Sequence, residues 1–133
     1  MSKRNKATTK DGYTATQMQT YCINRIQNDL GGVAWRNNSG ALGIGSRFVR
    51  FGKVGSGDVI GLLPPNGRFV NIEVKTTNDD PSAEQIEFML RVREAGGVAF
   101  IAESIADVDA GLEPTPTTYQ PTNHTWIVKD EWK

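Results

Sequence analysis

Apolar residues recur along the chain with two spacings, one typical of helices and one typical of strands. Helical spacing over residues 14–30 predicts a first helix that ends at Gly31, and a second helix is predicted to begin after Ser82 and to end at Gly96. Ser82 and Gln85 fit a capping box at the start of the second helix. The predicted buried stripes consist of Met18, Tyr21, Cys22, Ile26 and Leu30 in the first helix and Ile86, Met89, Leu90 and Ala95 in the second.

Shorter runs of β-branched and aromatic residues predict strands at 33–35, 46–51 and 126–128. Residues 36–45 are polar and rich in glycine, so this segment is expected to be irregular. Residues 98–102 are almost wholly apolar and predict a buried strand, after which Ser104 caps a short helix that extends to about Ala110. The order of elements indicates an α/β fold with a mixed sheet of about four or five strands flanked by helices.

Two strand-like runs, 57–63 and 68–75, flank the turn 64–67, a pattern typical of an antiparallel hairpin with Pro65, Asn66 and Gly67 at positions that a type I turn favours. A hairpin centred between Pro65 and Asn66 places Asp58 directly opposite Glu73, with Cβ atoms roughly 5 Å apart. A bulge would shift the pairing by one residue and move Asp58 to the other face of the sheet.

The second hairpin strand has two chemically different faces. Asn71, Glu73 and Lys75 alternate with apolar residues at 70, 72 and 74, so they share a face. Two carboxylates, Asp58 and Glu73, with Lys75 beside them suit metal-assisted hydrolysis of a phosphodiester: the carboxylates and the Val74 backbone carbonyl hold Mg²⁺ or Mn²⁺, and Lys75 orients or deprotonates the attacking water. The alternative is a polar strand face that is merely solvated.

Length and composition narrow the class of protein. The chain has 133 residues, enough for one domain. A flexible basic arm is predicted for 1–12 and a Pro- and Thr-rich extension for 113–133. The single cysteine forms no internal disulfide, and neither a membrane-spanning run nor a signal peptide is recognised, so an intracellular protein is expected, in the cytoplasm of a bacterium or of a phage-infected cell. In the glycine-rich run at 52–57, Lys53 precedes Gly55 and Gly57, whereas the lysine of a phosphate-binding loop follows its glycines, so no nucleotide cofactor is expected.

Charge is divided unevenly along a chain whose net charge is zero. Residues 1–53 contain nine Lys or Arg and two Asp, whereas residues 54–133 contain six basic and thirteen acidic residues. This asymmetry indicates either a polyanionic partner such as DNA or simply a solvated basic segment. The candidate DNA contacts are Arg36, Asn37, Asn38, Arg47, Arg50 and Lys53.

Three motifs together resemble a known nuclease family. Gly57-Asp58, then Ile72-Glu73-Val74-Lys75, then residues 82–85 are similar to the virus-type replication-repair nuclease (VRR-NUC) branch of the PD-(D/E)xK superfamily, and the run at 35–40 is similar to a segment common in that branch. The resemblance spans about residues 14–104, within a nuclease domain placed at 13–112.

The resemblance carries expectations about fold and function. It implies a restriction-endonuclease-like αβββαβ core and a homodimeric DNA endonuclease that uses Mg²⁺ or Mn²⁺ on nicked, flapped or branched DNA. It also implies that Asp58, Glu73 and Lys75 are catalytic and that Gln85 acts near the scissile phosphate in addition to capping its helix.

One feature departs from the family pattern. Members usually carry a further glutamate on the first helix, but residues 14–30 contain no Glu, and Gln17 and Gln19 are the candidates for its place. This departure keeps an alternative open, a non-catalytic DNA- or protein-binding module that retains the nuclease fold.

Overall fold

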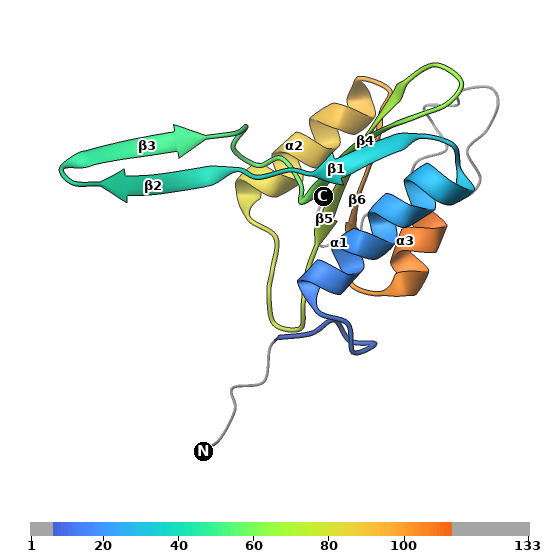
Figure 1. Cartoon of the computed structure of the whole chain (residues 1–133), viewed down its shortest axis with the longest axis horizontal. Coiled ribbons are helices and arrows are strands. Elements are labelled where there is room, and N and C mark those ends of the chain that lie inside the picture. The colour runs from blue at the N-terminus through green and yellow to red at the C-terminus, as the bar shows by residue number, and fades with distance from the viewer. Residues whose placement is uncertain (1–6, 113–133) are drawn as a thin grey trace.

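The computed structural model describes residues 7–112, which form six strands and four helical segments (Figure 1). In chain order these are α1 (Ala15–Asn24), the π-helical turn η1 (Arg25–Asp29), β1 (Val33–Arg36), β2 (Gly40–Ile44), β3 (Arg47–Phe51), β4 (Val59–Leu63), β5 (Arg68–Val74), α2 (Ala83–Glu94), β6 (Val98–Ala102) and α3 (Ile105–Leu112). The strand predicted at 126–128 and the rest of the C-terminal extension lie outside the described residues. No helix within residues 7–112 is long and apolar enough to cross a membrane.

Four strands form the central sheet in the order β1-β4-β5-β6. The first three are antiparallel, whereas β6 runs parallel to β5 after the α2 crossover. With β2 and β3 set aside as an insertion, the chain order is α1, β1, β4, β5, α2, β6. The αβββαβ core expected from the sequence is therefore confirmed, with a mixed sheet of four strands and a restriction-endonuclease-like fold.

The sheet lies between two layers of helix (Figure 1). α1 packs on β1, β4 and β5, and α3 packs on β6 and α1, whereas α2 contacts β5 and β6 from the opposite side. The larger apolar core, which includes Met18, Val70, Ile72 and Phe100, lies under α1 and α3, and a smaller cluster of Met89, Ala99 and Ile101 lies under α2. Both faces of β5 are consequently covered.

The hairpin register predicted from the turn is confirmed. Val59 lies opposite Ile72 and Ile60 lies opposite Asn71, as a centre between Pro65 and Asn66 requires. Gly67 closes the turn with φ of 69°, a backbone conformation that glycine adopts at little cost.

Both long helices begin with a capping box. Ser82 and Gln85 form the predicted one, and Thr14 and Gln17 form a second that the sequence analysis did not identify. The predicted stripe of α2 is wrong at Leu90 and at Ala95, both of which are exposed, while Val92 packs against the smaller core cluster instead.

The segment expected to be irregular contains a strand. Gly40–Ile44 pairs antiparallel with Arg47–Phe51 to form a two-stranded ribbon, because Leu42 and Ile44 alternate with glycine before a turn at Gly45. The strand predicted at 46–51 exists, but it pairs with β2 and not with the central sheet. Figure 1 shows this ribbon projecting from the body of the domain.

The described part of the predicted N-terminal arm is anchored. Thr9 is 2% exposed, Thr8 forms a β-bridge with Thr14, and Asp11 accepts a hydrogen bond from the Ile105 backbone amide at the start of α3. Residues 8–11 are therefore held against the domain, in contrast to the flexible segment that the sequence predicted there.

Candidate active site

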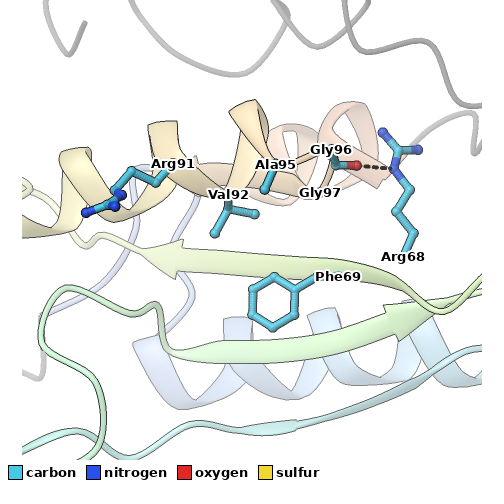
Figure 2. Close-up of a pocket in the computed structure, with 7 residues that line it drawn as sticks. All are labelled: Arg68, Phe69, Arg91, Val92, Ala95, Gly96 and Gly97. Carbon is cyan, nitrogen blue, oxygen red and sulfur yellow. Dashed lines mark hydrogen bonds between the residues drawn. The ribbon is translucent and has the colours of Figure 1, made fainter.

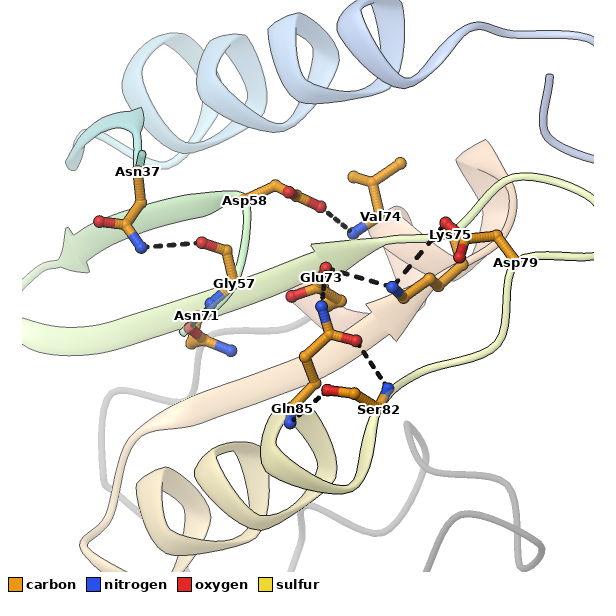
Figure 3. Close-up of polar contacts among 10 residues, drawn as sticks. All are labelled: Asn37, Gly57, Asp58, Asn71, Glu73, Val74, Lys75, Asp79, Ser82 and Gln85. Carbon is orange, nitrogen blue, oxygen red and sulfur yellow. Dashed lines mark hydrogen bonds and ion pairs between the residues drawn. The ribbon is translucent and has the colours of Figure 1, made fainter. Parts of the chain in front are cut away.

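Four of the predicted site residues come together where β4 begins, β5 ends and α2 begins (Figure 3). Asp58 directly precedes β4, Glu73 lies near the end of β5, Lys75 follows that strand, and Gln85 lies in the first turn of α2. The antiparallel register of the hairpin joins the first two, and the short connection from β5 to α2 brings Gln85 over them.

Asp58 turns its carboxylate toward the edge of β5. Its backbone amide donates to the Ile72 carbonyl at 2.8 Å, and its Oδ2 accepts from the Val74 amide at 2.8 Å. The N–H and C=O groups of one strand residue point to the same edge, so the Val74 carbonyl is directed to the side on which Asp58 lies. The predicted pairing of Asp58 with Glu73 thus continues the ladder by one residue beyond β4.

Glu73 is almost completely buried, with 6% of its surface exposed. Its Oε1 accepts a hydrogen bond from Gln85 Nε2 at 2.9 Å and lies 3.6 Å from Lys75 Nζ. Its Oε2 is buried without a hydrogen-bond partner. Burial raises the pKa of Glu73 to about 8; the negative charge of Asp58 adds to this rise and Lys75 opposes it.

Lys75 is buried between two acidic side chains. Its Nζ lies 3.6 Å from Glu73 Oε1 and 3.8 Å from Asp79 Oδ2. Asp79 was not predicted as a site residue, because its position in the loop after β5 gave no signal that the chain turns back. Asn78, with φ of 67°, lies in that turn. The ammonium group is therefore held beside Glu73 from two sides.

Gln85 caps α2 and also contacts Glu73, while its action near the scissile phosphate stays a prediction. Its backbone amide donates to Ser82 Oγ at 3.1 Å, and its Oε1 accepts from the Ser82 amide at 2.8 Å. Its Nε2 remains free for Glu73 (Figure 3). One side chain thus links the start of α2 to the buried carboxylate.

Two asparagines position the backbone around Asp58. Asn71, 1% exposed, accepts a hydrogen bond from the Gly57 amide at 2.7 Å. Asn37 donates from its backbone amide to the Asp58 carbonyl and from its side chain to Gly57 O and Ser56 Oγ. Asn71 had no assigned role in the sequence analysis; the available signal was an amide at an inward-facing strand position.

The remaining predicted DNA contacts are spread over β1 and the ribbon. Arg36 donates to Thr20 on α1 at 2.9 Å. Arg47 and Arg50 lie on β3, and Asn38 and Lys53 flank the ribbon, all four exposed. They are not gathered around the carboxylates, and their contact with DNA stays a prediction.

Neither glutamine proposed for the first helix joins the site through a described hydrogen bond. Gln17 is exposed and completes the Thr14 cap, and Gln19 is partly buried. Cys22 is a buried residue of α1 whose pKa is raised to about 12, mainly by burial and in part by the negative charge of Asp58. Among residues 7–112, no three His, Cys, Asp or Glu side chains lie close enough together to hold a metal ion.

The donors that are present fit a divalent cation. Two carboxylates meet at a point where one of them has a buried oxygen with no partner, and burial makes a second negative charge costly there. Oxygen donors of this type suit Mg²⁺ and Mn²⁺. A bound cation would satisfy both the orphaned oxygen and the excess negative charge.

A comparison with known protein families identifies the type of domain. The family model of the VRR-NUC domain matches residues 13–106. The chain belongs to the VRR-NUC family. The match covers every element from α1 to β6, including the ribbon and all four clustered site residues, so the resemblance seen in the sequence is confirmed and the chain carries a nuclease-type domain. No curated protein sequence matches this chain.

Proposed function

We propose that this VRR-NUC protein is a DNA endonuclease that depends on Mg²⁺ or Mn²⁺ and hydrolyses phosphodiester bonds. The observation that carries the proposal is the buried carboxylate of Glu73, with one oxygen unpartnered, beside Asp58 and Lys75. The family supports a nuclease at the level of class, and DNA is its expected substrate.

Each group has a role that follows from its surroundings. Asp58 and Glu73, with the Val74 carbonyl, hold the cation. When bound, the cation polarises a phosphoryl oxygen and lowers the pKa of the attacking water. Lys75 orients that water, takes part in its deprotonation and offsets negative charge that develops on the phosphate. Gln85 fixes the rotamer of Glu73 and lies next to the reacting groups.

Substrate preference and assembly extend the proposal. We expect nicking or structure-specific cleavage, on flap or junction DNA, by a homodimer. Incubation of the purified protein with Mg²⁺ or Mn²⁺ and supercoiled, single-stranded, flap and four-way-junction DNA tests this directly. Cleavage of at least one DNA that stops with EDTA is expected, and no cleavage of any of them with either ion would contradict the proposal.

A non-catalytic binding module is the second candidate function. It is favoured by the finding that no third acidic ligand accompanies Asp58 and Glu73 within the described residues. Calorimetric titration with Mn²⁺ separates the two candidates. A catalyst binds the ion through Asp58 and Glu73, so the affinity falls when either is replaced, whereas a pure adaptor shows no such binding.

Gln85 gives a prediction that separates capping from chemistry. Ser82→Ala removes the acceptor for the Gln85 amide and should lower the free energy of unfolding by about 1 kcal/mol with cleavage unchanged. Gln85→Ala should cost a similar amount of stability and also slow cleavage roughly tenfold or more, because Glu73 loses its hydrogen-bond donor. Urea unfolding and initial cleavage rates measure both effects. Equal rates in the two variants would mean that Gln85 only caps α2.

A further inference from the structure

α2 covers only half of its side of the sheet. It packs on β5 and β6, and within residues 7–112 no other helix contacts β1 or β4 from that side. Trp35 lies opposite Ile60, which lies opposite Asn71, and directly opposed residues share a face. Asn71 and Glu73 are two residues apart on β5 and therefore share a face, and Glu73 contacts Gln85 of α2. Trp35 and Ile60 consequently lie on the side of the sheet that α2 covers in part.

The uncovered part of this side is apolar. We call it the bare sheet face; it consists of Val33, Trp35, Ile60 and Leu62. Val33 and Trp35 are each 47% exposed and Leu62 is 37% exposed. Apolar side chains gathered in one place on a surface commonly mark a protein interface.

A pocket of about 390 Å³ continues the bare sheet face along α2. Phe69, directly opposite Leu62, lines it together with Val92 and Ala95, and Arg68 and Arg91 line it as well. Figure 2 shows the Phe69 ring extending from β5, with Val92 on α2 and Ala95 just after the end of that helix. The apolar surface is thus hollowed at one end and suited to receive side chains.

The β2–β3 ribbon presents a second apolar surface. Leu42 lies opposite Val49 and Gly40 lies opposite Phe51, so one face of the ribbon carries Leu42, Ile44, Val49 and Phe51, with Arg47 opposite Ile44 at the turn end of that face. The four apolar side chains are between 40% and 56% exposed. A two-stranded ribbon is marginally stable in water and gains stability when its apolar face is covered.

The two surfaces match in chemistry and in extent. The eight side chains together present on the order of 700 Å² per copy, close to the roughly 800 Å² that each partner contributes to a stable interface of standard size. Both surfaces belong to every copy, as a two-fold interface requires. Phosphates gain nothing from contact with four apolar side chains, so DNA is the less suited occupant of this face, although Arg47 lies at its turn end and Arg50 lies on the other face of the ribbon.

We infer that the ribbon of one copy packs its apolar face on the bare sheet face of a second copy, and that the second copy does the same in return. This contact supplies the interface of the homodimer proposed above and so rests on that proposal, but it does not depend on cleavage. The occupant of the bare sheet face is therefore a second copy of this chain.

Sedimentation velocity on the full chain tests the inference. The wild type should sediment as a species of about 29 kDa, twice the 14.6 kDa of one chain. Trp35→Glu on the bare sheet face and Leu42→Glu on the ribbon should each weaken association roughly 100-fold, since a carboxylate is placed in an apolar contact. Leu90→Glu is the matched control, because Leu90 is also 37% exposed. Leu90 lies three residues before Arg93, so the two share one side of α2, and Arg93 donates to the Ala99 carbonyl of β6. Leu90 therefore lies on the β6 side of the helix, away from the bare sheet face.

Mixing the two variants tests the pairing itself. The Trp35→Glu copy keeps an intact ribbon and the Leu42→Glu copy keeps an intact sheet face, so the mixture should dimerise at concentrations where each variant alone is monomeric. A wild type that stays monomeric at 100 µM, dimers that survive both substitutions, or a mixture that remains monomeric would overturn the inference. Weaker DNA binding by Leu42→Glu with unchanged mass would assign the ribbon to DNA instead.

Two controls keep this test separate from folding and from cleavage. Circular dichroism and urea unfolding check that the variants fold, and Leu42→Ser and Trp35→Gln serve at the same positions if either glutamate variant fails to do so. Glu73→Gln should remain dimeric, so the loss of cleavage expected for that variant tests the proposed function and leaves the interface unaffected.

Discussion

Replacing Glu73 by Gln should lower the rate of metal-dependent DNA cleavage by roughly 10³-fold or more while the domain stays folded. Gln keeps the shape of the side chain and an oxygen for the Gln85 hydrogen bond, but it removes the negative charge that holds the cation. Because burial already raises the pKa of Glu73 to about 8, a neutral side chain is well tolerated at this position. Initial rates on the preferred DNA and Mn²⁺ calorimetry measure the effect.

Glu87→Gln is the matched control for this substitution. Glu87 lies on the exposed side of α2, and among the described residues it pairs with Arg91, at 3.8 Å, so its replacement should leave both rate and metal affinity unchanged. Asp58→Asn keeps an oxygen for the Val74 amide and should reproduce the loss seen with Glu73→Gln. Cleavage by the Glu73→Gln protein at the wild-type rate would refute the assignment of the site.

In the absence of divalent cations, the wild-type protein should lose stability as pH rises from about 5 to about 8. Glu73 has an ordinary pKa of 4.5 and a pKa of about 8 in the folded protein, so in this range the folded state holds a proton that the unfolded chain has released. Stability falls where the folded state binds more protons, by roughly 1 kcal/mol per pH unit for one group. Urea unfolding in EDTA across this range measures the slope.

Two comparisons isolate the contribution of Glu73 to that slope. The Glu73→Gln protein has no such group and should show a flatter dependence of the free energy of unfolding on pH. Saturating Mn²⁺ should restore the stability of the wild type near pH 8, because the ionised carboxylate then has a partner. Identical slopes for wild type and variant in EDTA would show that Glu73 does not retain its proton on folding.

Features set by neighbouring residues could be predicted from the sequence. The turn at 64–67 determined the hairpin register, and Ser82 with Gln85 determined where α2 begins, because in each case the interacting groups are a few residues apart. The grouping of Asp58 with Glu73 followed from that register. Motif order then predicted the αβββαβ core and the family, both of which are confirmed.

The features that were missed or predicted wrongly are of two kinds, local ones and ones that depend on distant segments. Gly40–Ile44 is rich in glycine and becomes a strand through its hairpin pairing with β3, and Asp79 reaches Lys75, four residues earlier, through a turn; glycine content and loop position concealed both of these short-range features. Asn71, in contrast, gains its role from Gly57, fourteen residues away. The bare sheet face exists because α2 crosses over β5 and β6 alone, which no single segment specifies.

Glu73 shows which properties of the site follow from the sequence and which follow only from the tertiary structure. The order of residues along the chain already placed an acid, a lysine and a second acid on one hairpin, because strand alternation and a turn are short-range properties. The burial of that acid, the oxygen left without a partner and the raised pKa arise only when α2 and β6 close over β5. Desolvation depends on every segment packed around a group, so the protonation of the site belongs to the folded domain and not to the motif.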